Sequence, residues 1–237
     1  MPASTVPAWL VPAFTRAATA AGATASTPQI DAAAHRLLER WTEPDRRYHD
    51  LSHLVDLLQH VDELNQECHN LHAVRLAAWY HGAVFDAAES AAYARRGGED
   101  EVASAEVARE DLTRLGVPEA AVEAVVGMVA GLARHSSETN SVDAAVLSDA
   151  DLAILASDPQ RYRLYLEKVR DEYRHIPTAD YMHARREIVD RLLSRDRLYT
   201  SPLGAGWERQ ARENLTAERA RLDRELQRVA ELSTDSP

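Results

Sequence analysis

The chain has 237 residues, of which 45% are hydrophobic and 27% are charged, and its formal net charge is −11. A chain of this length can bury the core of one large domain, and its polarity excludes a protein built mainly of membrane spans. The acidic balance also argues against general binding to nucleic acids or anionic membranes, because both need a basic face that neutralises phosphates.

Three features of the sequence indicate the cellular compartment of the protein. They are the first residues, the longest apolar stretch and the single cysteine. Residues 1–14 carry no charged leading region and are interrupted by prolines, so we expect no secretory signal peptide. Residues 120–133 include Glu123 and fall short of the ~20 apolar residues that a membrane span needs. Cys68 is the only cysteine, so no disulfide forms within the chain, and we expect an ordinary thiol. A reducing, cytoplasmic location is therefore predicted.

Apolar residues recur at helical spacing through much of the chain, and no window shows the two-residue alternation of strands. The clearest helical segments, in chain order, are residues 51–64, 104–115, 120–133, 161–173 and the charged stretch 208–232. Paired glycines and charges indicate an exposed loop at 92–101. The sequence predicts an all-α, single-domain helical bundle over 28–232, with an N-terminal helical extension at 1–27 and a disordered tail at 233–237.

Two histidines lie four residues apart in the segment YHDLSHL. If the helix that begins near residue 51 already covers both, His49 and His53 share one helical face and could face a single pocket. The alternative is that His49 is a surface histidine near the helix start and that His53 is a core histidine with a satisfied hydrogen bond.

Two further segments place polar side chains among apolar neighbours. His81 lies in the stretch WYHGAVF and is expected to point at the core. In LSDADLAIL, Asp149 could cap a helix or offer a second carboxylate. Asp151 would lie beside apolar residues, where an unpaired carboxylate is costly and a cation stabilises it. Taken singly, each of these residues more often has a structural role.

Together, and in this order, the segments resemble the HD superfamily of metal-dependent phosphohydrolases. The similarity covers about residues 30–220 and is closest to a bacterial branch of predicted HD phosphohydrolases. The landmarks of that branch are similar to RRYHDLSHL, DEVASAE, GLARHSS, DADLAIL, VRDEY and ARENLTAE. YHDLSHL is also similar to the YHNxxHA segment of cyclic-nucleotide phosphodiesterases, where the first histidine donates a proton to the leaving group and the second binds metal.

The resemblance implies an HD-type helical bundle in which His53, His81 and Asp151 bind one divalent transition metal, Mn, Fe, Co or Zn. It also implies that His49 acts as the general acid while a metal-activated water attacks phosphorus. The implied activity is hydrolysis of a phosphomonoester or phosphodiester of a small metabolite or nucleotide. No nucleic-acid or membrane partner is expected.

The chain departs from the family at Gly82, which stands where an aspartate usually follows the second histidine. Glycine offers no ligand. One interpretation is a degenerate HD domain that binds a ligand or partner without turnover. The other is that a different acid supplies the carboxylate, and Glu101 in DEVASAE is the expected donor, with a solvated surface acid as the alternative. Because the carboxylate that would complete the site is missing, Gly82→Asp should strengthen metal binding. It should destabilise the chain after chelation and stabilise it with Mn or Zn present.

Candidate substrate-binding residues lie in the second half of the chain. VRDEYRH places Arg170 and Tyr173 three residues apart, and Arg185 lies on the next expected helix, where arginine suits phosphate oxygens. The alternative is that these arginines pair with neighbouring acids on a solvated face. His135 follows an apolar helix and could line the pocket, bind a second ion or have a structural role.

Overall fold

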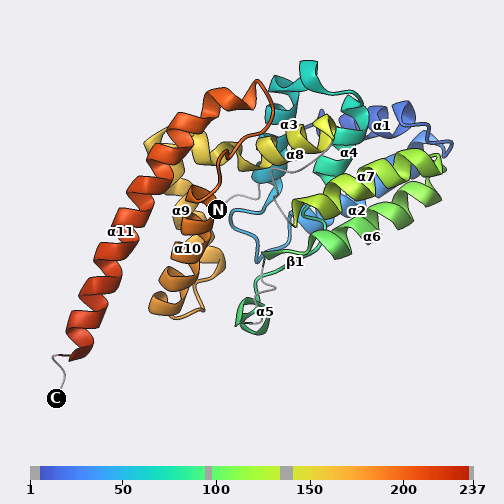
Figure 1. Cartoon of the computed structure of the whole chain (residues 1–237). Helices are drawn as coiled ribbons and strands as arrows, with labels where there is room; N and C mark the ends of the chain where they lie inside the picture. Colours follow the sequence, from blue (N-terminus) through green and yellow to red (C-terminus); the bar gives the residue numbers. More distant parts are fainter. Residues whose placement is uncertain (1–5, 94–97, 134–140, 235–237) are drawn as a thin grey trace.

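The helices of the first two thirds of the chain surround one apolar core (Figure 1). The structure is a computed structural model that describes residues 6–93, 98–133 and 141–234. The helices around this core are α1 (Leu10–Ala20), α2 (Thr27–Trp41), α3 (Leu51–Glu63), α4 (Leu71–Tyr80), α6 (Glu101–Arg114), α7 (Glu119–Leu132) and α8 (Val142–Asp151). α6 packs along α7, and α4 contacts α1, α7 and α8, so α4 is central to this part.

Polar side-chain caps set where helices α3 and α6 begin. The Asp50 side chain accepts hydrogen bonds from the backbone N–H groups of Ser52 and His53, at 2.8 and 3.3 Å, so α3 begins directly after it. Asp100 accepts a hydrogen bond from the N–H of Ala103 at 2.9 Å and begins α6 in the same way. These caps satisfy amides that have no partner within the helix, and they fix the helix starts at these positions.

A small hairpin separates α4 from α6. Its elements are β1 (Phe85–Asp86), α5 (Glu89–Tyr93) and β2 (Gly98–Glu99). The strands are antiparallel, and Phe85 pairs with Glu99. The prediction of an exposed loop at 92–101 is wrong for β2, because Gly98 is buried and only 12% of the Glu99 side chain is exposed. Gly98 has a φ of +113°, which favours glycine and allows this pairing.

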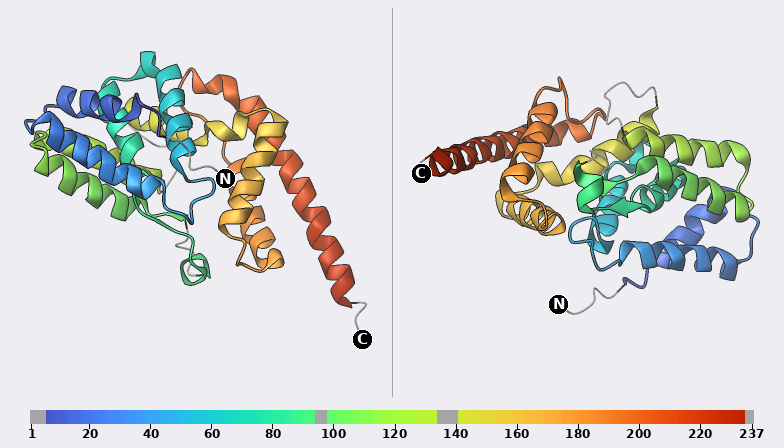
Figure 2. Two further views of the ribbon diagram at one scale, coloured as in Figure 1. Left: turned by 180° about the vertical axis from the view of Figure 1, so that it is seen from behind. Right: turned by 90° about the horizontal axis from the view of Figure 1, so that it is seen from below.

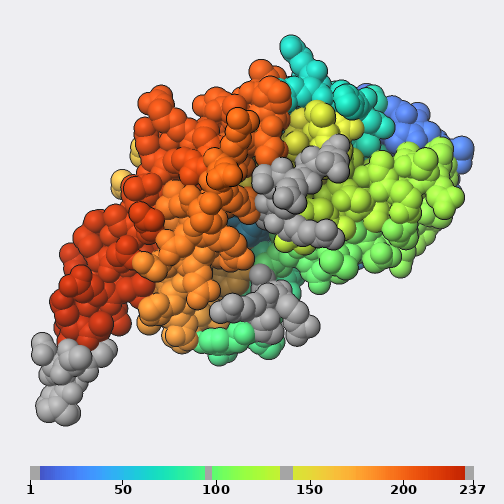
Figure 3. Space-filling model, viewed as in Figure 1, coloured from blue at the N-terminus to red at the C-terminus, as the bar shows by residue number. Residues whose placement is uncertain are grey.

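The last third of the chain packs around a second apolar cluster that includes Tyr162, Val189 and Leu215. Its elements are η2 (Leu152–Ala156), α9 (Pro159–Glu172), α10 (Thr178–Leu193), η3 (Gly204–Trp207) and α11 (Glu208–Thr234), while η1 (Asn65–Glu67) follows α3. α11 packs along α10 and η2, and its far end extends beyond the other helices (Figure 2). Tyr93 of α5 donates a hydrogen bond to Asp180 of α10 at 2.6 Å, and the two elements adjoin in Figure 3.

The prediction of an all-α, single-domain helical bundle is confirmed, with β1 and β2 as the only strands among the described residues. The segment predicted as an N-terminal extension contains α1, whose Phe14 is buried and packs against Trp79 with the ring centroids 5.1 Å apart. The predicted charged helix is α11. Within the described ranges, every helix is too short or too polar to cross a membrane.

Candidate metal centre

Four side chains from four separate elements meet inside the molecule. His53 lies on α3, His81 directly follows α4, Glu99 ends β2 and Asp151 ends α8. One ligand atom of each residue lies within 4.8 Å of those of the other three. The structure therefore brings together the three residues that the family resemblance implied, and it adds Glu99. Two imidazoles and two carboxylates in one place could hold a metal ion.

The donor atoms of this cluster face one another at short range. His53 Nε2 is 3.1 Å from His81 Nε2 and 3.3 Å from Asp151 Oδ1, and Glu99 Oε1 is 3.3 Å from His81 Nε2. His81 Nδ1 lies 2.7 Å from the carbonyl oxygen of Ala78 and donates its proton there, because a carbonyl oxygen only accepts. In the neutral ring the Nε2 lone pair of His81 then points into the cluster, as it does in metal-binding histidines.

Burial makes the cluster costly without a cation. His81 is fully buried and His53 is 5% exposed. Burial lowers the pKa of His81 more than the Glu99 and Asp151 carboxylates raise it, so the ring stays neutral, which is the form that binds metals. Glu99 Oε1 is buried and accepts no hydrogen bond from the described residues. Such a carboxylate oxygen is unfavourable on its own, and a bound cation would stabilise it.

The packing around the cluster leaves no room for a side chain at Gly82. A Cβ atom at this position would overlap Cη2 of Trp41 and would lie 2.6 Å from Glu99 Oε1. The Trp41 indole is held in place because its N–H donates a hydrogen bond to the carbonyl oxygen of Trp79 at 3.0 Å. Trp41 and the Glu99 carboxylate thus fill the space beside His81 that a side chain at residue 82 would enter.

Glu101, the acid expected to replace the missing aspartate, lies near the cluster but is not one of its four converging groups. It is the first residue of α6 and is half-buried. Burial, together with the charges of Glu99 and Asp151, raises its pKa to about 7. The carboxylate that lies against His81 is that of Glu99 and not that of Glu101, because the pairing of β1 with β2 brings residue 99 there.

Asp149, the candidate second carboxylate, binds a different part of the chain. Its side chain is buried, and Oδ2 accepts hydrogen bonds from the backbone N–H groups of Thr200 and Ser201, at 3.0 and 2.7 Å. Positions 149 and 151 are two residues apart on α8 and project from different faces of the helix. Asp149 thus anchors the segment that precedes η3 and is not one of the four groups that converge in the cluster.

His49 lies beside the cluster, but it precedes α3, so the expected shared helical face with His53 does not form. Its Nδ1 is 2.8 Å from Oε2 of Glu172, and its ring centroid is 5.6 Å from that of His53. Burial alone would lower the pKa of His49, but nearby carboxylates, with Glu99 and Glu172 foremost, raise it to about 9. Its imidazolium form is therefore stabilised next to the four groups of the cluster.

Glu172, at the end of α9, is not among the site residues that the sequence predicts. Its side chain is fully buried, and Oε1 accepts hydrogen bonds from the N–H groups of Arg47, Tyr48 and His49 at 2.8–2.9 Å. Burial alone would raise the pKa of Glu172, but His49 and these hydrogen bonds lower it. The two residues of the pair are 123 positions apart, and the landmark VRDEY was the one signal that could have pointed to Glu172.

The other candidate substrate-binding residues differ in their surroundings. Arg170 donates hydrogen bonds to the carbonyl oxygens of Tyr173 and Ile176, at 2.5 and 3.0 Å. Arg185 is buried and forms a two-bond ion pair with Glu218, at 2.8 and 3.1 Å. Arg170 therefore stabilises the turn between α9 and α10. Arg185 links α10 to α11, and it does so inside the molecule rather than on a solvated face.

Tyr173 lies against the strand that carries Glu99. Its hydroxyl oxygen would be 3.3 Å from a Cβ atom at Gly98, so it lies against β2, next to Glu99. Burial raises the pKa of Tyr173, and the charges of Glu172 and Glu99 add to this effect, so the hydroxyl stays protonated. His135 lies outside the described residues.

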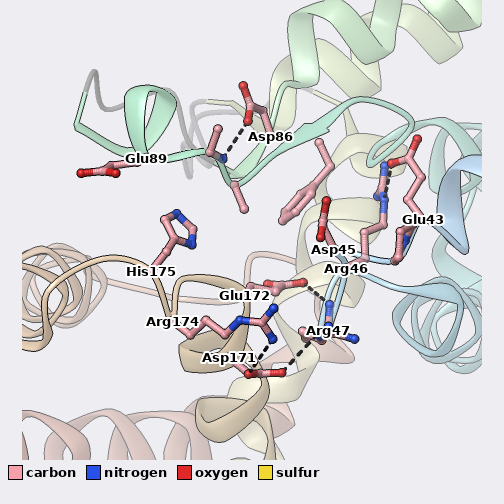
Figure 4. Close-up of a pocket in the computed structure, with 14 residues that line it drawn as sticks. Glu43, Asp45, Arg46, Arg47, Asp86, Glu89, Asp171, Glu172, Arg174 and His175 are labelled. Atoms are coloured by element: carbon pink, nitrogen blue, oxygen red, sulfur yellow. Dashed lines mark hydrogen bonds and ion pairs between the residues drawn. The ribbon is translucent and has the colours of Figure 1, made fainter. Parts of the chain in front are cut away.

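A cavity of about 450 Å³ lies next to residues that contact His49. Figure 4 shows the side chains that line it. Its wall is formed by residues from the stretches 43–47, 85–89 and 171–175. Phe85 and Glu172 belong to this wall and also contact His49: the Phe85 and His49 ring centroids are 5.2 Å apart, and Glu172 holds His49 Nδ1. The cavity is thus next to the histidine that the motifs imply as a proton donor.

Comparison of the chain with protein-family models, with curated proteins and with solved structures finds no match. The fold and the cluster described above rest on the sequence and structure of this chain. The family resemblance remains a prediction from its motifs, and the function is argued from the geometry of the site.

Proposed function

We propose that the protein is a metal-dependent phosphohydrolase that cleaves a phosphomonoester or phosphodiester of a small metabolite or nucleotide. The observation that carries this proposal is the convergence of four metal-binding groups beside a histidine that a buried glutamate holds. The arrangement supplies a place for a cation and a proton donor within one site. The HD-type bundle implied by the motifs uses the same combination.

The four groups suit a divalent transition metal such as Mn, Fe, Co or Zn, whose bonds to imidazole and carboxylate are about 2.0–2.2 Å long. Neighbouring ligands around such an ion lie about 2.8–3.6 Å apart when those bonds meet at right or tetrahedral angles. Three of the separations between donor atoms, at 3.1, 3.3 and 3.3 Å, fall in this range. When bound, the ion would activate a water as nucleophile and polarise a phosphoryl oxygen.

His49 supplies the proton that the leaving group needs. Glu172 accepts the hydrogen bond from Nδ1, so the ring is held in one orientation and its second N–H remains for the leaving oxygen. The three backbone hydrogen bonds to Glu172 hold the glutamate itself in place. Phe85, packed on the His49 ring, and Trp41, packed on the His81 ring, limit the access of water to the cluster.

The alternative function is a degenerate HD domain that binds a ligand or partner without turnover. Gly82 favours it, since this residue removes the aspartate of the family motif. Glu99 weighs against it because this carboxylate provides a fourth donor beside His81. Turnover distinguishes the two functions, since a binding module would hold an ion without hydrolysing phosphate esters.

Metal content and ester hydrolysis test the proposal together. The chain, freed of metal by chelation and reloaded with Mn²⁺, Fe²⁺, Co²⁺ or Zn²⁺, should bind one ion and hydrolyse 4-nitrophenyl phosphate or bis(4-nitrophenyl) phosphate. Glu99→Gln should lower the ion affinity by roughly 10-fold or more, whereas Glu101→Gln should retain the ion. His49→Ala should keep the ion and lower kcat by roughly 100-fold.

Asp196→Asn is a matched control because Asp196 is exposed on the segment between α10 and η3, and it should change neither metal content nor turnover. A wild-type chain that binds none of these ions stoichiometrically would contradict the metal centre. Loss of the ion from His49→Ala would reassign His49 as a ligand. An ion held without hydrolysis of either ester would favour the binding module.

A further inference from the structure

We propose that the cavity beside His49 takes the leaving group of the substrate, and that this leaving group is an alcohol that carries an ammonium group. The inference rests on the proposed function and narrows its substrate class to phosphate esters of amino alcohols. Two observations carry it: the position of the cavity relative to the metal-binding cluster, and the charges on its wall.

Arg46 connects the cavity to the cluster. It lines the cavity, and its Nη1 donates a hydrogen bond to the carbonyl oxygen of Gly82 at 2.8 Å, directly after His81. Its guanidinium group is sandwiched between the rings of Trp41 and Phe85, 5.2 and 5.1 Å from their centroids. Nη2 is buried and has no hydrogen-bond acceptor among the described residues. A phosphoryl oxygen bound between the cluster and the cavity would satisfy this donor.

The arginines on the cavity wall are already paired with acids. Arg46 contacts Glu43 at 3.1 Å, while Arg47 and Arg174 both contact Asp171, at 3.2 and 3.6 Å. The wall therefore offers an incoming anion no arginine that lacks a carboxylate partner. Of the fourteen lining residues six are acidic and only three are arginines, so the wall has an excess of negative charge.

The excess is carried by Asp45, Asp86 and Glu89, which have no basic partner among the described residues. Figure 4 shows Asp86 and Glu89 on one wall of the cavity, with His175 and Arg174 on the other side of it. Asp86 also accepts a hydrogen bond from the N–H of Ala88 at 2.8 Å, so this carboxylate is held in position.

This charge distribution selects among leaving groups. A leaving group with a carboxylate or a further phosphate would meet like charges, whereas an ammonium group would meet opposite ones. The phosphoryl group and the ammonium group would then lie at opposite ends of the substrate, the first near Arg46 and the cluster, the second near the carboxylates. Because these carboxylates are exposed, the selectivity should be moderate and should weaken with salt.

Binding of three matched phosphate esters tests this inference. O-phosphoethanolamine carries an ammonium group, propyl phosphate is its uncharged counterpart, and phosphoglycolate carries a carboxylate. Isothermal titration of the Mn²⁺-treated chain at low ionic strength should give O-phosphoethanolamine an affinity about 5-fold higher than that of propyl phosphate, with phosphoglycolate the weakest. The preference should shrink in 0.5 M NaCl.

The double variant Asp45→Asn, Asp86→Asn should remove most of this preference and should not lower the affinity for propyl phosphate, since asparagine at 86 can still accept the hydrogen bond from Ala88. Glu63→Gln, an exposed carboxylate on α3, is the control and should keep the preference. Equal or tighter binding of phosphoglycolate, a preference that survives in the double variant, or no binding of any ester would each overturn the inference. These results are read from affinity, so they stand apart from the hydrolysis assay that tests the proposed function.

Discussion

At the scale of single residues, the absence of a side chain at Gly82 leaves the space that the Glu99 carboxylate occupies beside His81. The glycine lets the Trp41 indole and the Glu99 carboxylate approach the backbone that follows His81, and the carboxylate then lies 3.3 Å from the His81 donor atom. A carboxylate is thus present beside His81. It comes from Glu99 on β2, 17 positions after Gly82, and not from the residue that directly follows His81.

Gly82→Asp should destabilise the chain both with and without metal, contrary to the expectation of stronger metal binding from the sequence alone. Its Cβ would overlap Trp41, and overpacking of this kind costs about 1–3 kcal/mol. The new carboxylate would also be buried near Glu99, where like charges disfavour ionisation. Melting temperatures of the wild type and the variant in a chelator and in Mn²⁺ measure the effect.

Gly127→Ala is the matched control for this substitution. Gly127 lies on α7, and a Cβ atom there would have no neighbour within 4 Å, so alanine should stabilise the chain by about 0.5–1 kcal/mol through helix propensity. A Gly82→Asp variant that melts at a higher temperature than the wild type in Mn²⁺ would show that the packing argument is wrong.

At the scale of elements, the segment between α2 and α3 is held by the end of α9. Glu172 accepts three consecutive backbone N–H groups of this segment and the Nδ1–H of His49. A single buried carboxylate thereby positions the proposed proton donor and joins the first part of the chain to the last. Because Glu172 ends a helix, its position depends on the packing of α9 against η2.

Glu172→Gln should lower the free energy of unfolding by about 1.5–3 kcal/mol at pH 7, the usual contribution of hydrogen bonds to a charged group. The pKa of Glu172 is lowered in the folded state, so its contribution is fully present above its unfolded pKa and is lost as the pH falls through the folded value. The difference between wild type and variant should therefore shrink in acid. Urea unfolding at pH 7 and below about pH 4 measures it.

Glu167→Gln, an exposed position on the same helix, should have little effect at either pH. A Glu172→Gln difference that is equal at neutral and acid pH would contradict the ionised state assigned to Glu172.

At the scale of the whole molecule, the cluster ties together elements that are far apart in the chain. Its residues come from α3, the end of α4, the hairpin and the end of α8. An ion held by all four would bind the folded chain and not the unfolded one, since the donor atoms converge only after folding.

Chelation should therefore lower the melting temperature of the wild-type chain. Free Mn²⁺ at 100 to 1,000 times its dissociation constant should add about 2.7–4.1 kcal/mol to the free energy of unfolding. Asp151→Asn should depend less on the ion than the wild type does, because it removes one of the four proposed ligands. An identical wild-type melting temperature with chelator and with each of the four ions would contradict the metal centre.

The sequence by itself determined the all-α class, the main helices and the three motif residues of the cluster. Helical periodicity is a local property, since residues three and four apart share a face whatever the rest of the chain does. His53, His81 and Asp151 could be selected because each lies in a short motif with a recognisable order.

Only the tertiary structure decided which acidic side chains lie in the cluster or next to it. Glu99 lies in a stretch with the composition of a loop, and Glu172 has the local context of a surface residue. Hairpin pairing nevertheless leaves only 12% of the Glu99 side chain exposed, and helix packing buries Glu172. Asp149, two residues from Asp151, is directed to Thr200 and Ser201 instead. These contacts join positions far apart in the chain, and because a contact of that kind imposes no periodicity, the local sequence does not identify the partner.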